Sequence, residues 1–137
     1  MHLEYQVYEA DFVNAGAASS AIKKTLKQLN VSPQIVKRVV VALYEAEVNA
    51  IAHAYGGTIY ADIEADKITV KVVDTGPGIP DIDWAMQEGN STASPEVRNM
   101  GFGAGMGLPN IQKNVDKLNV TSTVGVGTTV EMEVNFV

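Results

Sequence analysis

Apolar and polar residues alternate over residues 3–9, "LEYQVYE", which is the period of a half-buried strand. The next apolar residues recur at helical spacing and predict a helix over about 15–29, which Asn14 can cap. One face of that helix is expected to consist of Ala18, Ile22, Leu26 and Leu29. The chain is therefore expected to open with a strand and an amphipathic helix.

A second, longer helix is predicted for residues 33–55. Ser32 can cap it, Pro33 suits its first position, and Gly56-Gly57 is a stop signal. Its side chains are apolar nearly all round, so we expect the helix to be buried against a sheet.

Strands and short helices alternate through the rest of the chain. The pattern predicts a hairpin of strands at 58–65 and 67–74, a short helix at 82–88, a helix at 107–117, and strands at 118–123 and 128–137. The apolar side of the last helix is expected to carry Leu108, Ile111, Val115 and Leu118. With no repeat and no internal boundary, the chain reads as one domain of α/β content, whose mixed sheet is covered on one face.

Composition narrows the class of protein. Hydrophobic residues make up 46% and charged residues 19% of the 137 residues, which is typical of a folded domain. The net charge of −6 gives no electrostatic footprint for nucleic acid or an anionic membrane. With no cysteine and two histidines, a disulfide frame, a thiolate metal site and a zinc enzyme are not expected. No signal peptide or membrane span is evident, so we expect a cytoplasmic protein.

A run of alternating glycines, "GFGAGMGLPN", occupies residues 101–110. It fails the dinucleotide pattern G-x-G-x-x-G in both registers, and no Gly-Lys pair exists to make a P-loop. The run leads directly into a helix with Pro109 in its first turn, and free N–H groups at a helix start attract anions. A phosphate site is therefore favoured over a flexible linker.

The long helix carries polar side chains in the stretch "YEAEVNAIAH". Glu45 and Asn49 lie only about 40° apart on one face, with His53 one turn further on, whereas Glu47 lies about 160° from Asn49. Asn49 offers a hard oxygen suited to Mg²⁺, and Glu45 could accept a proton from an attacking hydroxyl. The alternative is a buried polar network, and Glu47 is expected to be solvated or to pack against a helix.

A second polar segment, "VVDTGPGIPD", follows the hairpin. Asp74 ends an apolar strand, where a carboxylate can accept a hydrogen bond from an exocyclic amine such as that of adenine. Gly76 and Gly78 leave the backbone bare enough for a flat ring to pack on it. An ordinary turn with an Asx cap is the alternative for this segment alone.

Four short motifs follow one another in the order Glu45-x-x-x-Asn49-Ala50, Asp74-x-Gly76-x-Gly78-Ile79, Gly103-x-Gly105-x-Gly107-Leu108 and Gly127-Thr128. Together they resemble the N, G1, G2 and G3 boxes of the GHKL ATPases, the superfamily of gyrase, the heat-shock protein 90 chaperone, MutL proteins and histidine kinases. The resemblance covers about residues 35–137. It implies the Bergerat fold, an α+β two-layer sandwich with a largely antiparallel sheet covered by helices on one face.

Within that superfamily the chain is similar to the small bacterial anti-sigma-factor serine kinases. "DTGPGIPDIDWAMQEGNST" and "GFGAGMGLPNIQK" look closer still to the switch kinases that phosphorylate STAS-domain proteins in partner-switching modules. The resemblance implies one HATPase_c-like kinase domain over 1–137 with an ATP lid at about 89–104. It also implies that Mg²⁺ and ATP are bound and that the γ-phosphate goes to a serine of a STAS-domain partner.

The resemblance also gives the motif residues their roles. It implies Glu45 as general base, Asn49 as the Mg²⁺ ligand and Asp74 as the reader of adenine, with His53 as a structural residue. The other implied nucleotide-binding residues are Gly76, Gly78 and Ile79 near adenine and ribose, Gly103, Gly105, Met106, Gly107 and Leu108 near the phosphates, Thr128 near adenine, and Arg98, from the lid, at the γ-phosphate.

Other functions for the same domain are weighed against the kinase. The domain could instead be an anti-sigma factor or a nucleotide-gated sequestering module, which exposed apolar residues around 35–40 or in the lid would favour. A histidine kinase would need a dimerisation helix with its phosphorylated histidine, which is not expected before residue 33. A gyrase-like ATPase would need a transducer domain. The sequence leaves open whether the domain forms a homodimer, and it predicts no nucleic-acid or membrane partner.

Overall fold

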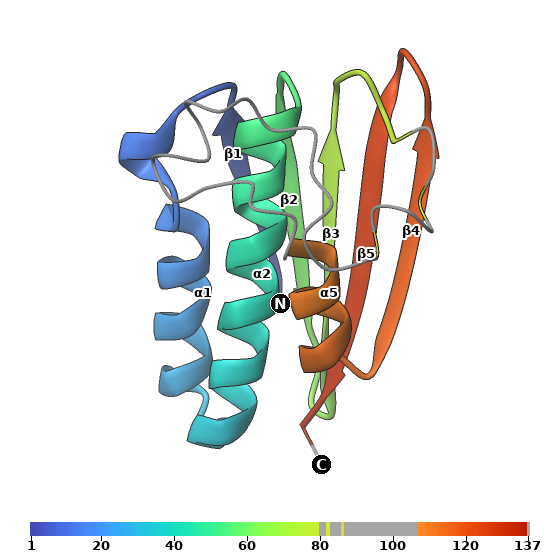
Figure 1. Ribbon diagram of the computed structural model, residues 1–137. Helices are drawn as coiled ribbons and strands as arrows, with labels where there is room; N and C mark the ends of the chain where they lie inside the picture. The colour runs from blue at the N-terminus through green and yellow to red at the C-terminus, as the bar shows by residue number, and fades with distance from the viewer. Residues whose placement is uncertain (80–81, 83–85, 87–106, 137) are drawn as a thin grey trace.

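Five strands form one antiparallel sheet in the order β1-β2-β3-β5-β4 in the computed structural model, which describes residues 1–79, 82, 86 and 107–136. Helices α1, α2 and α5 lie on one face of this sheet, with α2 between the other two (Figure 1). The expected α+β sandwich is therefore confirmed, and each described strand pairing is antiparallel. The elements are β1 His2–Tyr8, η1 Phe12–Asn14, α1 Ala17–Gln28, α2 Pro33–His53, β2 Gly56–Ile63, β3 Lys67–Asp74, α5 Gly107–Asn114, β4 Lys117–Thr123 and β5 Gly127–Asn135.

The core lies between the sheet and the three helices. The expected apolar stripes supply most of it: Ile22 and Leu26 of α1 and Leu43 of α2 are fully buried, as is Ile111 of α5. Leu29, expected on the stripe of α1, is instead 46% exposed, because the helix ends at Gln28 and Leu29 is its C-cap. Alternate residues of the strands meet them from the sheet, such as Ile59, Ile68, Val70, Val72, Met132 and Val134. Burial of this apolar area is the main driving force for the fold.

The start of α1 differs from its prediction. The helix begins at Ala17 with Gly16 as N-cap, and the Asn14 side chain instead donates to the carboxylate of Asp11. The donors at the helix start are satisfied by Glu47, a residue of α2. The start of α2 agrees with its prediction, since Ser32 Oγ accepts a hydrogen bond from the N–H of Ile35.

The end of α2 also differs from its prediction. The helix ends at His53, and Gly56 and Gly57 belong to β2. Gly56 has a φ of +101°, and a Cβ on it would lie 2.5 Å from the carbonyl oxygen of Val7. The glycine is therefore required by the close approach of β1 and β2, and the side chain of His53 lies outside the described part of the chain.

Helix α5 is shorter than its prediction because the chain joins the sheet early. The N–H of Asp116 donates to the carbonyl of Glu133 at 2.9 Å, and β4 begins at Lys117. Leu118 therefore packs against the core from a strand rather than from the helix. The expected helix at 82–88 and the lid at 89–104 fall outside the described residues, apart from Ile82 and Met86.

Candidate functional site

Helix α2 presents Glu45 and Asn49 on one half-buried face, one turn apart as their spacing predicts. Glu45 Oε1 accepts a hydrogen bond of 3.3 Å from Nδ2 of Asn110, a residue in the first turn of α5. That bond fixes the first motif beside the helix that the glycine run enters. Within the described residues, no protein group hydrogen-bonds the amide of Asn49, so its oxygen is available to a ligand.

The carboxylate of Asp74 lies at the end of β3, where it is half-buried. Its Oδ1 accepts a hydrogen bond of 2.9 Å from the N–H of Thr128, the second residue of β5. Burial raises the pKa of Asp74 above its ordinary value, and the bond from Thr128 partly offsets the rise. The bond joins the second and fourth motifs, although 54 positions separate the two residues in the chain.

A chain of hydroxyl groups continues from Thr128 toward the loop after β3. Ser122 Oγ lies 2.8 Å from Thr128 Oγ1 and donates to the carbonyl of Gly127 at 3.1 Å. The N–H of Ile79 donates to the same Ser122 Oγ at 2.7 Å. Because Ser122 has one hydroxyl hydrogen, Thr128 is the donor in their shared bond, and its own lone pairs stay free to accept.

Ser122 belongs to this site although the sequence reasoning missed it. It is the last residue but one of β4, and no motif of the sequence includes it. Only the pairing of Ser122 with Thr128 in the β4–β5 register could have indicated the contact. Such a register is set by the whole sheet, and the hydrophobic pattern near Ser122 does not reveal it.

The loop after β3 is held against both α2 and the β4–β5 turn. The N–H of Tyr55, just after α2, donates to the carbonyl of Thr75 at 2.6 Å. A Cβ on Gly76 would lie 2.9 Å from the Cα of Ala54. Gly78 has a φ of +76°, and a Cβ there would lie 2.6 Å from the carbonyl oxygen of Thr123. Tight backbone packing thus explains both glycines, in addition to any ring that packs on the loop.

Glu47 is buried against the start of α1, so of its two predicted environments the packing against a helix is confirmed and the solvated one is wrong. It is 2% exposed, and its oxygens accept from the N–H groups of Gly16, Ala18 and Ser19 at 3.0, 3.4 and 3.1 Å. The hydroxyl of Ser19 also donates to it at 2.8 Å. These bonds give the start of α1 the acceptor that the local sequence does not supply.

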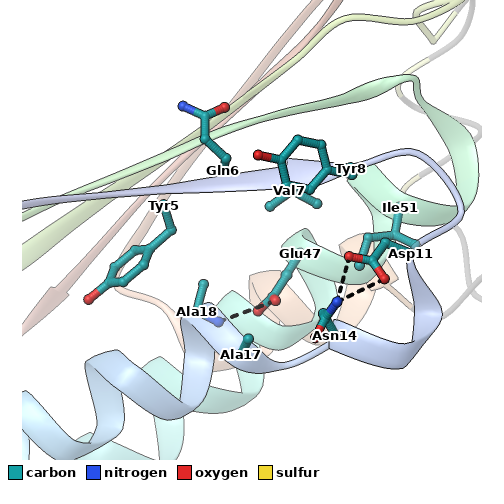
Figure 2. A pocket seen from close by; sticks show the side chains of 10 residues that line it. All are labelled: Tyr5, Gln6, Val7, Tyr8, Asp11, Asn14, Ala17, Ala18, Glu47 and Ile51. Atoms are coloured by element: carbon teal, nitrogen blue, oxygen red, sulfur yellow. Dashed lines mark hydrogen bonds between the residues drawn. The ribbon is translucent and has the colours of Figure 1, made fainter.

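Glu47 also borders a hollow of about 260 Å³ between β1 and the two helices α1 and α2 (Figure 2). Tyr5 points to the helix side of β1, whereas Gln6 and Tyr8 point to the other side. The hollow is lined by Tyr5, Gln6, Val7, Tyr8, Asp11, Asn14, Ala17, Ala18, Glu47 and Ile51. Among the described residues, none that the motifs assign to nucleotide lines this hollow.

Some predicted residues have no described position. Arg98, Gly103, Gly105 and Met106 lie outside the described residues. Gly107 is the first residue of α5, and Leu108 is 6% exposed within the core, so Leu108 anchors the start of α5. Among the described residues, no group of three or more histidine, cysteine or carboxylate side chains could hold a metal ion. No described helix is both long and apolar enough to cross a membrane.

The fold and the paired motifs define a nucleotide-binding sandwich, and the comparisons agree. Residues 8–134 match the family model "Histidine kinase-like ATPase domain". The chain is 37% identical over 124 residues to an anti-sigma F factor of Thermoanaerobacter sp. (strain X514), covering 87% of this chain and 83% of the relative. It is 31% identical over 119 residues to the serine/threonine-protein kinase RsbT of Bacillus subtilis (strain 168), covering 84% of each.

A solved structure shows the same fold. The crystal structure of the RsbU and RsbW domains of a Mycobacterium tuberculosis protein matches 98% of this chain and 32% of that one, with a TM-score of 0.66 and 16% identity. This chain belongs to the histidine kinase-like ATPase domain family, in the partner-switching group that includes anti-sigma F factors and RsbT. The resemblance stated from the four motifs is thereby confirmed.

Proposed function

We propose that this protein is an ATP-dependent serine-protein kinase of a bacterial partner-switching module, whose substrate is a serine of a STAS-domain protein. The observation that carries the proposal is a pair of hydrogen bonds: one joins the first motif to the helix in which the third motif ends, and the other joins the second and fourth motifs. Asn110 to Glu45 links α5 with α2, and Thr128 to Asp74 links β5 with β3. The similarity to the serine/threonine-protein kinase RsbT supports this reading.

The residues around Asp74 fit an adenine ring. Asp74 Oδ1 is occupied by the N–H of Thr128, and Oδ2 has no partner in the described part of the chain. A partly desolvated carboxylate oxygen of this kind is a strong acceptor for an exocyclic amino group. Thr128 Oγ1 adds a second acceptor beside it, because its hydrogen goes to Ser122. Together, Asp74 Oδ2 and Thr128 Oγ1 can accept hydrogen bonds from the edge of a base.

The residues on α2 fit the phosphate end of ATP. When bound, Mg-ATP supplies the phosphoryl group to be transferred and ADP as the leaving group. Asn49 would offer its side-chain oxygen to Mg²⁺, an ion that commonly takes only one or two protein ligands beside phosphate oxygens. Arg98 and the glycines at 103, 105 and 107 are proposed for the phosphates on the motif resemblance alone.

Glu45 is proposed as the general base. Its Oε1 is oriented by Asn110, and its Oε2 has no partner among the described residues, so Oε2 can accept the proton of an incoming serine hydroxyl. The new bond forms between the serine oxygen and the γ-phosphorus while the bond from that phosphorus to ADP breaks. The proton then resides on Glu45.

The test is phosphate transfer from labelled ATP to a STAS-domain protein by wild type and Glu45→Gln. Glutamine keeps an acceptor for Asn110 but cannot take a proton, so kcat should fall by about 10²- to 10⁴-fold with ATP affinity little changed. Asn110→Ala is the matched control, and it should cost far less because the base remains. A wild-type rate for Glu45→Gln would overturn the base assignment. Binding of ATP without any transfer by wild type would overturn the kinase proposal.

A second candidate function is the sequestering of a sigma factor, which the names of the anti-sigma F factor relatives favour. The residues at 35–40 give it no additional support, since Val36 and Val39 are buried and Ile35 and Val40 are half-buried. Capture of a sigma factor by Glu45→Gln as well as by wild type would support this role. Loss of capture with loss of catalysis would contradict it.

A further inference from the structure

The charges of the chain are distributed unevenly, although the net charge is −6. Residues 12–44 contain no aspartate or glutamate. The same stretch holds five of the ten basic residues, and it covers α1 and the first half of α2. The basic residues are Lys23, Lys24 and Lys27 of α1 and Lys37 and Arg38 of α2. One corner of an acidic protein is therefore positively charged.

The four lysines of this stretch are exposed and free of ion pairs. None of them contacts a carboxylate in the part of the chain that the structure describes. Arg38 is different: its Nη2 lies 3.1 Å from Oδ1 of Asp116, and its Nε donates to the carbonyl of Asn114. Its charge is therefore used inside the fold. The other four, Lys23, Lys24, Lys27 and Lys37, are called the lysine face below.

The lysine face lies at one end of the helical layer. Ile22 and Leu26 turn the opposite side of α1 to the core, which leaves Lys23, Lys24 and Lys27 on the solvent side. Figure 1 shows α1 at one edge of the helical layer, with its end beside the start of α2. Lys37 is the fifth residue of α2. The face is therefore formed by two neighbouring helices.

We propose that the lysine face is a docking surface for an acidic face of a partner protein. Four uncompensated like charges on one surface favour association with the opposite charge and raise its rate. This inference rests on the proposed function, because it names the surface that receives the protein partner of that function.

The chemistry of the face favours a protein over a membrane or a nucleic acid. The other exposed residues of α1 are Ala17, Ser20 and Gln28, and Leu29, 46% exposed at its C-cap, is the one large apolar side chain exposed beside them. A single leucine is not the broad apolar face with which a helix inserts into a lipid surface. Helix α1 contains no arginine and no aromatic residue, the side chains that stack on bases or hydrogen-bond their edges. Tyr44, 38% exposed on α2, adds the kind of aromatic contact that protein interfaces use.

The lysine face is near the candidate site but not part of it. Lys37 and Glu45 are on the same helix and about 12 Å apart along its axis. A partner of ordinary interface size can therefore bind the face and still bring a serine to Glu45. Charge on the face should affect how tightly the partner binds and leave the chemical step unchanged.

The test compares two charge-reversal triples with the same change in net charge. One carries Lys23→Glu, Lys24→Glu and Lys27→Glu; the control carries Lys67→Glu, Lys71→Glu and Lys117→Glu, on the face of the sheet that the helices leave bare. Because Lys67 and Lys71 pair with Glu133 and Glu131, the thermal midpoint of each triple is measured first to show that it is folded at the assay temperature. In the labelled-ATP assay at low salt, the first triple should raise KM for the STAS-domain protein at least about fivefold with kcat within twofold. The control triple should not raise KM, and added salt should reduce the difference in KM between the two triples. A triple with glutamine in place of the three lysines of α1 repeats the test without new charge.

Binding of a fluorescein-labelled glutamate-rich peptide provides a second readout that does not depend on catalysis. Wild type and the control triple should bind the peptide, and the α1 triple should not. Equal KM values for wild type and the α1 triple, or an equal rise in both triples, would overturn the docking surface and leave the kinase proposal standing. If wild type phosphorylates no STAS-domain protein, the kinase proposal fails and the peptide alone decides the docking surface. The docking surface would be overturned if wild type does not bind the peptide, or if it binds anionic phosphatidylglycerol vesicles in place of the peptide.

Discussion

Asp74 carries a carboxylate at a half-buried position where no described cation neutralises it. Its single described hydrogen bond, from Thr128, does not outweigh the cost of desolvation, because the pKa stays raised. A residue that lowers stability in this way is expected at a binding site rather than in a purely structural turn. The sequence predicted the importance of Asp74 from its place after an apolar strand, but the partner on β5 follows only from the sheet.

Asp74→Asn tests this reading at the level of one residue. Asparagine keeps an acceptor for Thr128, but its second polar atom is an NH2 donor that cannot accept a hydrogen bond from the adenine amino group. The variant should therefore lose measurable ATP binding.

The raised pKa of Asp74 also predicts a pH dependence of stability. Ionisation of this carboxyl lowers the free energy of unfolding as the pH rises from below its ordinary pKa to above its pKa in the folded protein. The variant and wild type should therefore have the same thermal midpoint near pH 3, and the variant should have the higher midpoint at neutral pH.

The measurement is thermal unfolding of both proteins across that pH range, without nucleotide. A constant difference at all pH values would show that the change acts through packing. Unchanged ATP affinity in the variant would remove Asp74 from the nucleotide site.

At the level of elements, α1 depends on a residue far along the chain. Local rules favoured Asn14 as its cap, yet the donors at its start bind Glu47, which is 31 positions from Gly16. Strands with clear alternation, such as β3, kept their predicted bounds because they depend only on the local period. The start of α1 and the ends of α1, α2 and α5 did not, because contacts with other elements decide them, whereas α2 and α5 begin at the predicted residues. Sequence reasoning therefore predicted the elements but not all their bounds.

Glu47→Ala should destabilise the protein by about 2–4 kcal/mol, since it leaves several buried donors without an acceptor. Asn14→Ala is the control, and it should cost less than about 0.5 kcal/mol because Asn14 does not cap the helix. Urea unfolding of the two variants and wild type measures both values. A larger loss for Asn14→Ala than for Glu47→Ala would restore the local cap.

At the scale of the whole molecule, two hydrogen bonds join elements that carry motif residues: Asn110–Glu45 joins α5 to α2, and Thr128–Asp74 joins β5 to β3. Motif order along the chain was enough to predict the family, which the match over residues 8–134 confirms. It could not predict the pairing of motifs: the first joins the start of α5, and the second joins β5. Such pairing depends on strand order in the sheet, in which β5 lies between β3 and β4.

Nucleotide that binds across this assembled site should stabilise the entire domain. A ligand specific for the folded state stabilises it by about 2.7 kcal/mol at a concentration of one hundred times its Kd, so Mg-ATP should raise Tm by several degrees. Differential scanning fluorimetry with and without Mg-ATP measures the rise, and ATP with EDTA tests the share due to Mg²⁺. An unchanged Tm at millimolar Mg-ATP would contradict the nucleotide site.

The position of β5 has a consequence for the order of events during synthesis. A ribosome makes β5 after the other four described strands, yet β5 fills the gap between β3 and β4 in the finished sheet. Until then β3 has a free edge and Asp74 lacks the N–H of Thr128. A nascent chain without β5 therefore lacks the pair of residues proposed for adenine, so the proposed nucleotide binding through this pair requires that β5 has been made.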